Sequence, residues 1–266
     1  MVSSHSAFDS GELTELAVTA AREAGQILLR GAEEGPVRAS AKSSRTDLVT
    51  VFDRRSEDHI VGLLTAHRPD DGVLGEEGGE RPGTSGVRWV IDPLDGTANY
   101  VARYPAFVVS VAAELDGVGV VGVVHDPSRQ ETFSAERGRG ARLNGRALHV
   151  PHAADGLAEV LLSTGFSSDL AVRARQAALA ARIACRVRDV RSSGSAALDL
   201  CWVAGGRLGA YYESDTRHWD RAAGALIASE AGAWVGDLDG GPASDRMVIA
   251  CTPGVEQGLR TLLGHA

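Results

Sequence analysis

The sequence predicts an α/β protein, and three observations lead to that class. Apolar runs at 87–91, 108–115, 118–125 and 131–135 follow one another across short turns, which is typical of an antiparallel meander. After residue 150, apolar runs alternate with helical patterns, as in an α/β unit. The composition, 44% hydrophobic and 23% charged, is that of an ordinary globular chain and excludes a disordered chain or a coiled coil.

The N-terminal half begins with two predicted helices. Residues 12–30 carry apolar side chains at helical spacing, with Asp9 and Glu12 as a capping pair, after a loose tail at 1–9. Residues 53–66 predict a second helix, and the polar segment 39–47 between the two predicts a hairpin or loop. Farther along, Asp-Gly at 116–117 predicts a hairpin turn. The glycine-rich segment 138–146 predicts a turn as well.

The C-terminal half predicts alternating strands and helices. Strands are expected at 160–163, 186–191, 209–213, 234–235 and 248–250, and helices at 170–183, 195–205, 219–231 and 255–263. A boundary near residue 150 then separates an N-terminal half, 1–150, with the antiparallel sheet, from a C-terminal half, 151–266. We expect the second half to complete a site whose main acidic residues come from the first.

Charge and cysteine content narrow the classes of partner. The net charge is −8, from 27 Lys+Arg against 35 Asp+Glu, and no basic patch stands out, so we expect no nucleic acid partner. The longest apolar runs, such as 107–113, fall short of the roughly 18 residues of a membrane span, and no signal-peptide pattern opens the chain. Cys185, Cys201 and Cys251 have no CxxC spacing, which favours small buried side chains in a reducing compartment. We expect a soluble cytoplasmic protein.

The densest cluster of chemically capable residues follows the apolar run at 89–91. Asp92 and Asp95 lie three residues apart, and Pro93 between them predicts that the strand ends at Asp92 and that Asp95 lies in the next turn. Gly96 permits a sharp bend, and a helix that begins at Thr97 would direct free amides toward an anion. Carboxylates for a hard cation beside amides for a phosphate suit phosphoryl transfer. The alternative is an Asp-rich loop with turn and capping roles.

Each of the other candidate carboxylates also has a structural explanation as an alternative to metal binding. Glu76 and Glu77 are flanked by glycines, and Glu76 could reach the same cation as Asp92 and Asp95, although surface glutamates are usually just solvated. Asp220 precedes a helical pattern and on its own would be an N-terminal cap. Asp47 and Asp53 have the same capping alternative.

Five motifs, at 47–53, 75–77, 89–100, 194–197 and 219–224, together resemble the inositol monophosphatase family. They occur in the family's order over about residues 10–265, which is far more specific than any one motif. The resemblance implies a five-layer α/β/α/β/α sandwich, a magnesium-dependent and lithium-sensitive phosphatase, and a homodimer.

The resemblance also implies roles for individual residues. Two or three Mg²⁺ ions would be held by Glu76, Asp92, Asp95, the Leu94 carbonyl, Asp220 and, through water, Asp53. Catalysis would depend on Asp95, and on Thr97 with Glu76, which orient the attacking water. The substrate would be lined by Asp95, Gly96, Thr97, Gly194, Ser195, Ala196, Glu213 and Asp220. The reaction implied is hydrolysis of inositol 1-phosphate or a similar polyol phosphate by metal-activated water.

Departures from the family pattern leave the substrate open. Ala98 stands where a second Thr is frequent, and 100–102 read Tyr-Val-Ala rather than Phe-Val-His. Histidinol phosphate, fructose 1,6-bisphosphate and a 3′-phosphoadenosine nucleotide are alternatives, although Ala98 and 105–107 disagree with the first and no Lys-Gly pair favours the last. The 194–197 motif with Glu213 fits the inositol-acting branch best. A different class is a non-catalytic protein that binds RNA polymerase or ribosome components. The histidines are read as bystanders, with His218 beside Asp220 left open.

Overall fold

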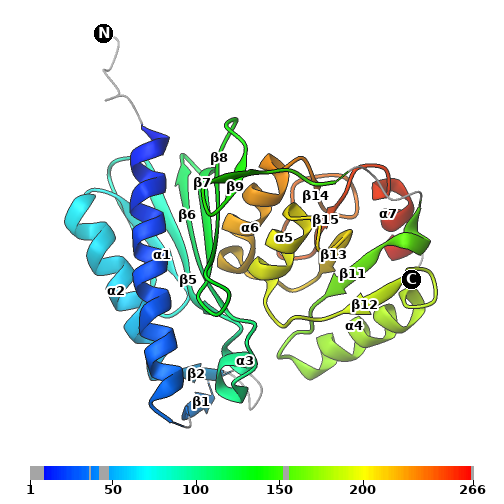
Figure 1. Cartoon of the computed structure of the whole chain (residues 1–266), viewed down its shortest axis with the longest axis horizontal. Helices are drawn as coiled ribbons and strands as arrows, with labels where there is room; N and C mark the ends of the chain where they lie inside the picture. Colours follow the sequence, from blue (N-terminus) through cyan, green and yellow to red (C-terminus); the bar gives the residue numbers. More distant parts are fainter. Residues whose placement is uncertain (1–8, 36, 42–47, 152–155, 265–266) are drawn as a thin grey trace.

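The computed structural model describes residues 9–35, 37–41, 48–151 and 156–264, and it has five layers. From left to right in Figure 1, helices α1 and α2 cover an eight-stranded sheet, α5 and α6 lie between that sheet and a five-stranded sheet, and α4 and α7 cover the far side. This arrangement confirms the predicted α/β class and the α/β/α/β/α layering.

The first layer holds the two predicted N-terminal helices, both longer than expected. α1 spans Ser10–Glu33, and the Asp9 carboxylate caps it by accepting the Gly11 N–H at 2.9 Å. α2 spans Val51–His67. Short strands β1 (Ala39–Ala41) and β2 (Leu48–Thr50) pair antiparallel between them, as a hairpin requires. Asp47 and the predicted tail at 1–8 lie outside the described residues.

The eight-stranded sheet has the order β10-β9-β8-β7-β6-β5-β3-β4. Its strands are β3 (Gly72–Gly75), β4 (Gly79–Arg81), β5 (Val87–Asp95), β6 (Val108–Leu115), β7 (Val118–Asp126), β8 (Glu131–Glu136), β9 (Ala141–Leu143) and β10 (Arg146–Leu148). All neighbours are antiparallel except β3 and β5, so the predicted meander is confirmed. The prediction of a simple turn at 138–146 is wrong, because β9 and the start of β10 form a further hairpin there.

Strand β5 continues past the point where the sequence predicted its end. Asp92 pairs with Ser110 and Asp95 with Val108, with a register shift between the two pairs. Proline lacks an N–H for the ladder, and such a bulge is one of the few places in a sheet that tolerates it. Asp95 therefore lies at the end of the strand and not in the following turn.

The five-stranded sheet has the order β12-β11-β13-β15-β14. β11 (Leu161–Thr164) runs parallel to β12 (Asp189–Arg191) and β13 (Ala210–Glu213), whereas β15 (Val248–Cys251) is antiparallel to β13 and β14 (Trp234–Gly236). The helices are α4 (Leu170–Ile183), α5 (Ala196–Ala204), α6 (His218–Glu230) and α7 (Glu256–Gly264), with a 3₁₀ turn at Leu157–Glu159. β12 is shorter than the predicted 186–191, and the 3₁₀ turn was not predicted.

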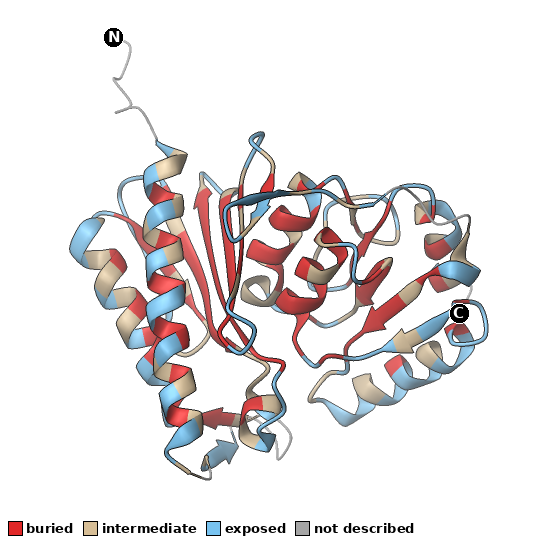
Figure 2. Ribbon diagram, in the orientation of Figure 1, coloured by how far each residue is buried: buried red, intermediate tan, exposed pale blue. Residues whose placement is uncertain are grey.

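In the central layer, α5 is almost wholly buried between the two sheets (Figure 2). A Cβ atom at Gly122 of β7 would lie 2.7 Å from the Ala223 carbonyl, so glycine lets α6 approach the sheet closely. α6 contacts strands of both sheets. The division of the chain at residue 150 stays a prediction.

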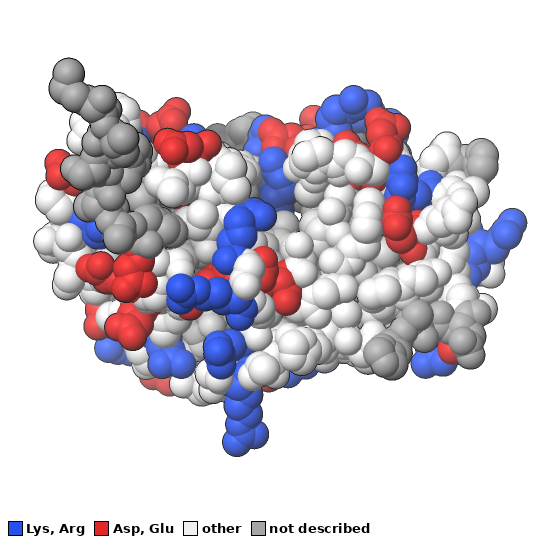
Figure 3. Space-filling model, turned by 90° about the horizontal axis from the view of Figure 1, so that it is seen from above, with Lys and Arg blue, Asp and Glu red and all other residues white. Residues whose placement is uncertain are grey.

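The cysteine and charge predictions have mixed outcomes. Cys201 and Cys251 are buried, as predicted, but Cys185 is exposed, and all three are free thiols. Acidic and basic side chains are interspersed on the face seen in Figure 3. No helix within the described ranges is both long and apolar enough to cross a membrane.

Candidate active site

A polar pocket lies where the two sheets and the central helices meet. Its empty space, including the part that is open to solvent, is about 530 Å³. The residues that line it are Glu76, Asp92, Leu94, Asp95, Gly96, Thr97, Gly165, Phe166, Gly194, Ser195, Ala196, Glu213 and Asp220. Every predicted site residue except Asp53 is among them. Gly165 and Phe166 were missed, because they belong to the segment after β11, which carries no motif.

Glu76 and Asp92 come together because β3 and β5 are parallel neighbours. Gly75 pairs with Ile91, and the Glu76 N–H donates to the Ile91 carbonyl at 3.2 Å. Asp92 is the next residue of β5, and its Oδ1 accepts the Leu94 N–H at 3.0 Å. The carboxyl ends of two parallel strands thus deliver both side chains to one edge of the sheet.

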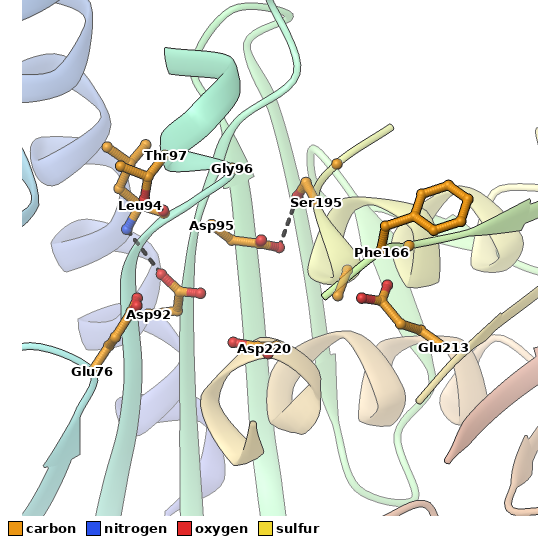
Figure 4. Close-up of a pocket in the computed structure, with 13 residues that line it drawn as sticks. Glu76, Asp92, Leu94, Asp95, Gly96, Thr97, Phe166, Ser195, Glu213 and Asp220 are labelled. Atoms are coloured by element: carbon orange, nitrogen blue, oxygen red, sulfur yellow. Dashed lines mark hydrogen bonds between the residues drawn. The ribbon is translucent and has the colours of Figure 1, made fainter. Parts of the chain in front are cut away.

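Asp95 joins the first sheet to the central layer. Its Oδ2 accepts the Ser195 hydroxyl at 2.7 Å and the Ala197 N–H at 2.8 Å, both at the start of α5 (Figure 4). Ser195 is also the N-cap of that helix. A carboxylate at the N-terminus of a helix is stabilised by the free amides and the helix dipole. Ser195, which the sequence predicted as a substrate contact, therefore also holds Asp95.

Thr97 begins the short helix α3 (Thr97–Ala102), as predicted. The preceding Gly96 has φ 99°, and a Cβ there would lie 2.8 Å from the Ala106 carbonyl, so only glycine fits this bend. The Thr97 hydroxyl lies 3.0 Å from Asp53 Oδ1 and 3.1 Å from the Leu94 carbonyl. Since it has one proton to donate, its lone pairs remain available to a group in the pocket.

Asp53 lies behind Thr97 and does not line the pocket. Its Oδ2 accepts the Thr50 N–H at 2.8 Å and the Thr50 hydroxyl at 2.6 Å, which completes a capping box at the start of α2. Its other oxygen is the acceptor for Thr97. The structure therefore confirms that Asp53 is a helix cap. It also shows that Asp53 contacts Thr97, a predicted catalytic residue. A role in metal binding through water stays a prediction.

Asp220 serves as a cap and as part of the pocket. It lies in the first turn of α6, where its Oδ2 accepts the Arg217 N–H at 2.7 Å. His218 points elsewhere, since its Nε2 lies 2.6 Å from Glu114 and it does not line the pocket. The open question about His218 is thus answered in favour of a structural role.

Glu213 lies at the end of β13, on the other side of the pocket from Glu76 (Figure 4). Its Oε2 accepts the Tyr211 hydroxyl at 2.8 Å. A Cβ atom at Gly165 would lie 1.8 Å from that same oxygen, so glycine is required for Glu213 to take this position. Beside them stands the ring of Phe166, 41% exposed at the pocket wall.

Mutual repulsion and burial perturb these carboxyl groups. Burial raises the pKa of Asp92, and the charges of Glu76, Asp95 and Asp220 raise it further. Burial is also the largest cause that raises the pKa of Asp220, followed by the charge of Asp95. Glu213 has its pKa raised to about 8, mainly by burial. Several negative charges in one partly buried space favour either protons or a cation.

The donor set fits a hard cation such as Mg²⁺, because every candidate ligand is an oxygen atom. Within the described ranges, however, no group of three or more His, Cys, Asp or Glu side chains is placed so that it could hold a metal ion directly. Metal binding by this set therefore requires the carboxylates to draw closer together than they stand here.

The fold and the pocket define a layered α/β protein with an acidic site between its sheets. The sequence model described as the inositol monophosphatase family matches residues 9–263, and the chain belongs to that family. An inositol-1-monophosphatase of Mycobacterium leprae is 45% identical over 245 residues, which cover 88% of this chain and 84% of that protein.

Two further similarities extend this result. The Nus factor SuhB of Escherichia coli is 40% identical over 235 residues, covering 86% of each chain. The solved inositol monophosphatase of Anabaena superposes with a TM-score of 0.85 at 32% identity, covering 96% of each chain. The relatives thus carry two kinds of name, one for an enzyme and one for a Nus factor.

Proposed function

We propose that the protein is a magnesium-dependent phosphomonoesterase that hydrolyses inositol 1-phosphate or a similar polyol phosphate. The observation that carries the proposal is that Glu76, Asp92, Asp95 and Asp220 surround one pocket with Thr97 at its edge. These residues come from four separate parts of the fold. Helix capping accounts for the positions of some of them and leaves the other positions unexplained. The enzyme name of the Mycobacterium leprae relative supports the same reaction.

In the proposed reaction, two magnesium ions would be held by Glu76, Asp92, Asp95, the Leu94 carbonyl and Asp220, and a third would be held more weakly by Asp53 through water. Bound magnesium would supply positive charge to the phosphate oxygens and lower the pKa of a water molecule. No covalent enzyme intermediate is needed.

The Thr97 hydroxyl, which donates to Asp53 or Leu94, can accept a hydrogen bond from the attacking water and so direct that water at phosphorus, while the Glu76 carboxylate takes the proton. The Gly96–Thr97 bend holds the phosphate, while Gly194, Ser195 and Ala196 line the alcohol. Asp95 and Asp220 contribute to the part of the pocket that holds the phosphate and to the part that lines the alcohol.

The alcohol preference follows from Glu213. A carboxyl group accepts hydrogen bonds from the hydroxyls of a polyol, and where it is ionised, which its pKa of about 8 places at alkaline pH, it also repels a second phosphate or the charge of a nucleotide. This favours inositol 1-phosphate over fructose 1,6-bisphosphate or a 3′-phosphoadenosine nucleotide. Lithium inhibition and homodimer assembly are part of the proposal on the grounds of family membership.

Phosphate release from a substrate panel, with magnesium and with a chelator, tests the proposal. We expect magnesium-dependent release, fastest with inositol 1-phosphate and slower with histidinol phosphate or fructose 1,6-bisphosphate. No release from any of them would favour the non-catalytic class, to which the name of the Escherichia coli relative points.

A further inference from the structure

Glu57 of α2 is a buried carboxylate outside the pocket, and it contacts the turn that carries Glu76. Its side chain is 5% exposed. Oε2 accepts the Glu77 N–H at 2.9 Å and Oε1 accepts the Gly78 N–H at 2.5 Å. Both oxygens are thus bonded to the two residues that directly follow Glu76.

The same contact explains why two residues of this turn are glycines. A Cβ atom at Gly75 would lie 2.7 Å from the Glu57 carboxyl group, and one at Gly78 would lie 2.7 Å from Oε1. Neither glycine has a positive φ, so the backbone conformation does not require them. It is the close approach of the Glu57 carboxylate that leaves no room for a side chain at either position.

The end of this turn faces solvent. Gly78, Gly79 and Glu80 are exposed, and a solvent-accessible cavity lies between α2 and the β3–β4 hairpin behind the turn. Short segments with little buried apolar surface open easily unless hydrogen bonds hold them. Hydrogen bonds to a charged acceptor are roughly twice as strong as neutral ones.

We propose that Glu57 is a positioning residue that clamps the 76–78 turn to α2 and thereby fixes where Glu76 enters the pocket. This inference rests on the proposed function, in which Glu76 binds metal and orients water. Glu57 itself lines the cavity behind the turn and is not among the residues that line the pocket.

Two variants and one control test the clamp. Glu57→Gln replaces one acceptor oxygen with a donor that cannot pair with a backbone N–H. Gly78→Ala leaves Glu57 in the chain but places a methyl group against its Oε1, on an exposed residue whose backbone tolerates alanine. Asp58→Asn is the control, because it removes the same charge from the neighbouring, exposed position of α2.

The first measurement is hydrogen–deuterium exchange of the peptide that contains 76–80, in protein without added metal. We expect about tenfold faster exchange in Glu57→Gln and Gly78→Ala, in keeping with the loss of a charge-assisted hydrogen bond. The second measurement is the magnesium concentration at half-maximal activity, which should rise several-fold in both variants while KM for the substrate changes little. Asp58→Asn should match the wild type in both.

Unchanged exchange in Gly78→Ala would overturn the clamp, and this variant decides the matter if Glu57→Gln does not fold. Faster exchange without a change in the magnesium concentration at half-maximal activity would contradict the role of Glu57 in positioning Glu76. The proposed function fails separately, if the wild-type protein shows no magnesium-dependent activity at all. The exchange measurement needs no metal and judges the clamp in that case too.

Discussion

The proposed reaction makes kcat depend on the hydroxyl group of Thr97. It lies between the buried Asp53 carboxylate and the pocket, and its proton is committed to Asp53 or to the Leu94 carbonyl. We predict that Thr97→Ala lowers kcat about 100-fold or more, because the attacking water loses the hydroxyl that orients it. The magnesium concentration at half-maximal activity should change little.

Thr97→Ser is the matched control, since it keeps the hydroxyl and loses only a methyl group. It should retain most of the rate. Steady-state kinetics with saturating magnesium measure both variants, and near-normal turnover by Thr97→Ala would contradict the assigned role.

Glu213 allows a test that separates the alcohol from the phosphate. Its carboxylate faces the pocket and is held by Tyr211. We predict that Glu213→Ala lowers kcat/KM for inositol 1-phosphate at least tenfold, because the hydroxyls of the substrate lose their acceptor. Hydrolysis of p-nitrophenyl phosphate, which has no such hydroxyls, should stay nearly unchanged. Equal losses on both substrates would move Glu213 into the catalytic or structural group.

The sequence predicts the residues of the pocket better than their partners. Glu76, Asp92, Asp95 and Asp220 could be named because motifs fix residue types along the chain. The bond from Ser195 to Asp95 joins residues 100 positions apart, and no local pattern encodes it. Gly165 could not be found either, since its need for glycine comes from a glutamate on another strand.

At the scale of elements, the errors have a common physical origin. Strand β5 passes Pro93 because a bulge in its pairing with β6 absorbs the missing N–H. β9 and β10 form in a glycine-rich segment because β8 offers an edge for pairing. Strand pairing depends on tertiary contacts between segments far apart in the sequence. Helices α1, α2 and α4 follow from local periodicity and were predicted closely.

The packing of α1 on the sheet predicts a pH dependence. His125 of β7 is 3% exposed, and burial, with a smaller effect of Arg22, lowers its pKa to about 4. The unfolded chain, with a pKa near 6.5, therefore binds a proton that the folded protein rejects between those two values. His125 alone should therefore lower the free energy of unfolding by about 2–3 kcal/mol as the pH drops from 7 to 4, against the opposite contribution of the buried carboxyl groups.

Urea unfolding at several pH values between 7 and 4 measures this effect. The free energy of unfolding of the wild type relative to His125→Gln should fall by that amount from pH 7 to pH 4, whereas the difference from His67→Gln, at an exposed position of α2, should stay constant. A constant difference from His125→Gln over this range would contradict the effect assigned to His125.

At the scale of the whole molecule, the pocket is where the two sheets and the central layer meet, so its charge affects the stability of the entire chain. Burial raises the pKa of Asp95 to about 7 and that of Asp220 to about 8, and neighbouring carboxylates add to both shifts. A carboxyl group with a raised folded-state pKa contributes stability at low pH that is lost as the pH rises through that value. In the metal-free protein these two groups should therefore cost stability as the pH rises from about 4, the pKa of an unfolded aspartate, to about 8.

Magnesium should reverse this loss, because it binds the folded state and replaces the protons between the carboxylates. At 100 times its Kd a ligand adds about 2.7 kcal/mol, and 1 kcal/mol corresponds to roughly 2–4 °C in a domain of about this size. We predict that millimolar magnesium raises Tm by several degrees, and by more at pH 8.5 than at pH 6. Asp220→Asn, which removes a charge but keeps the size of the side chain, should shrink the increase at pH 8.5. Thermal unfolding with and without magnesium at both pH values measures it, and an absent shift, or one that is larger at pH 6, would exclude these carboxylates as the metal site.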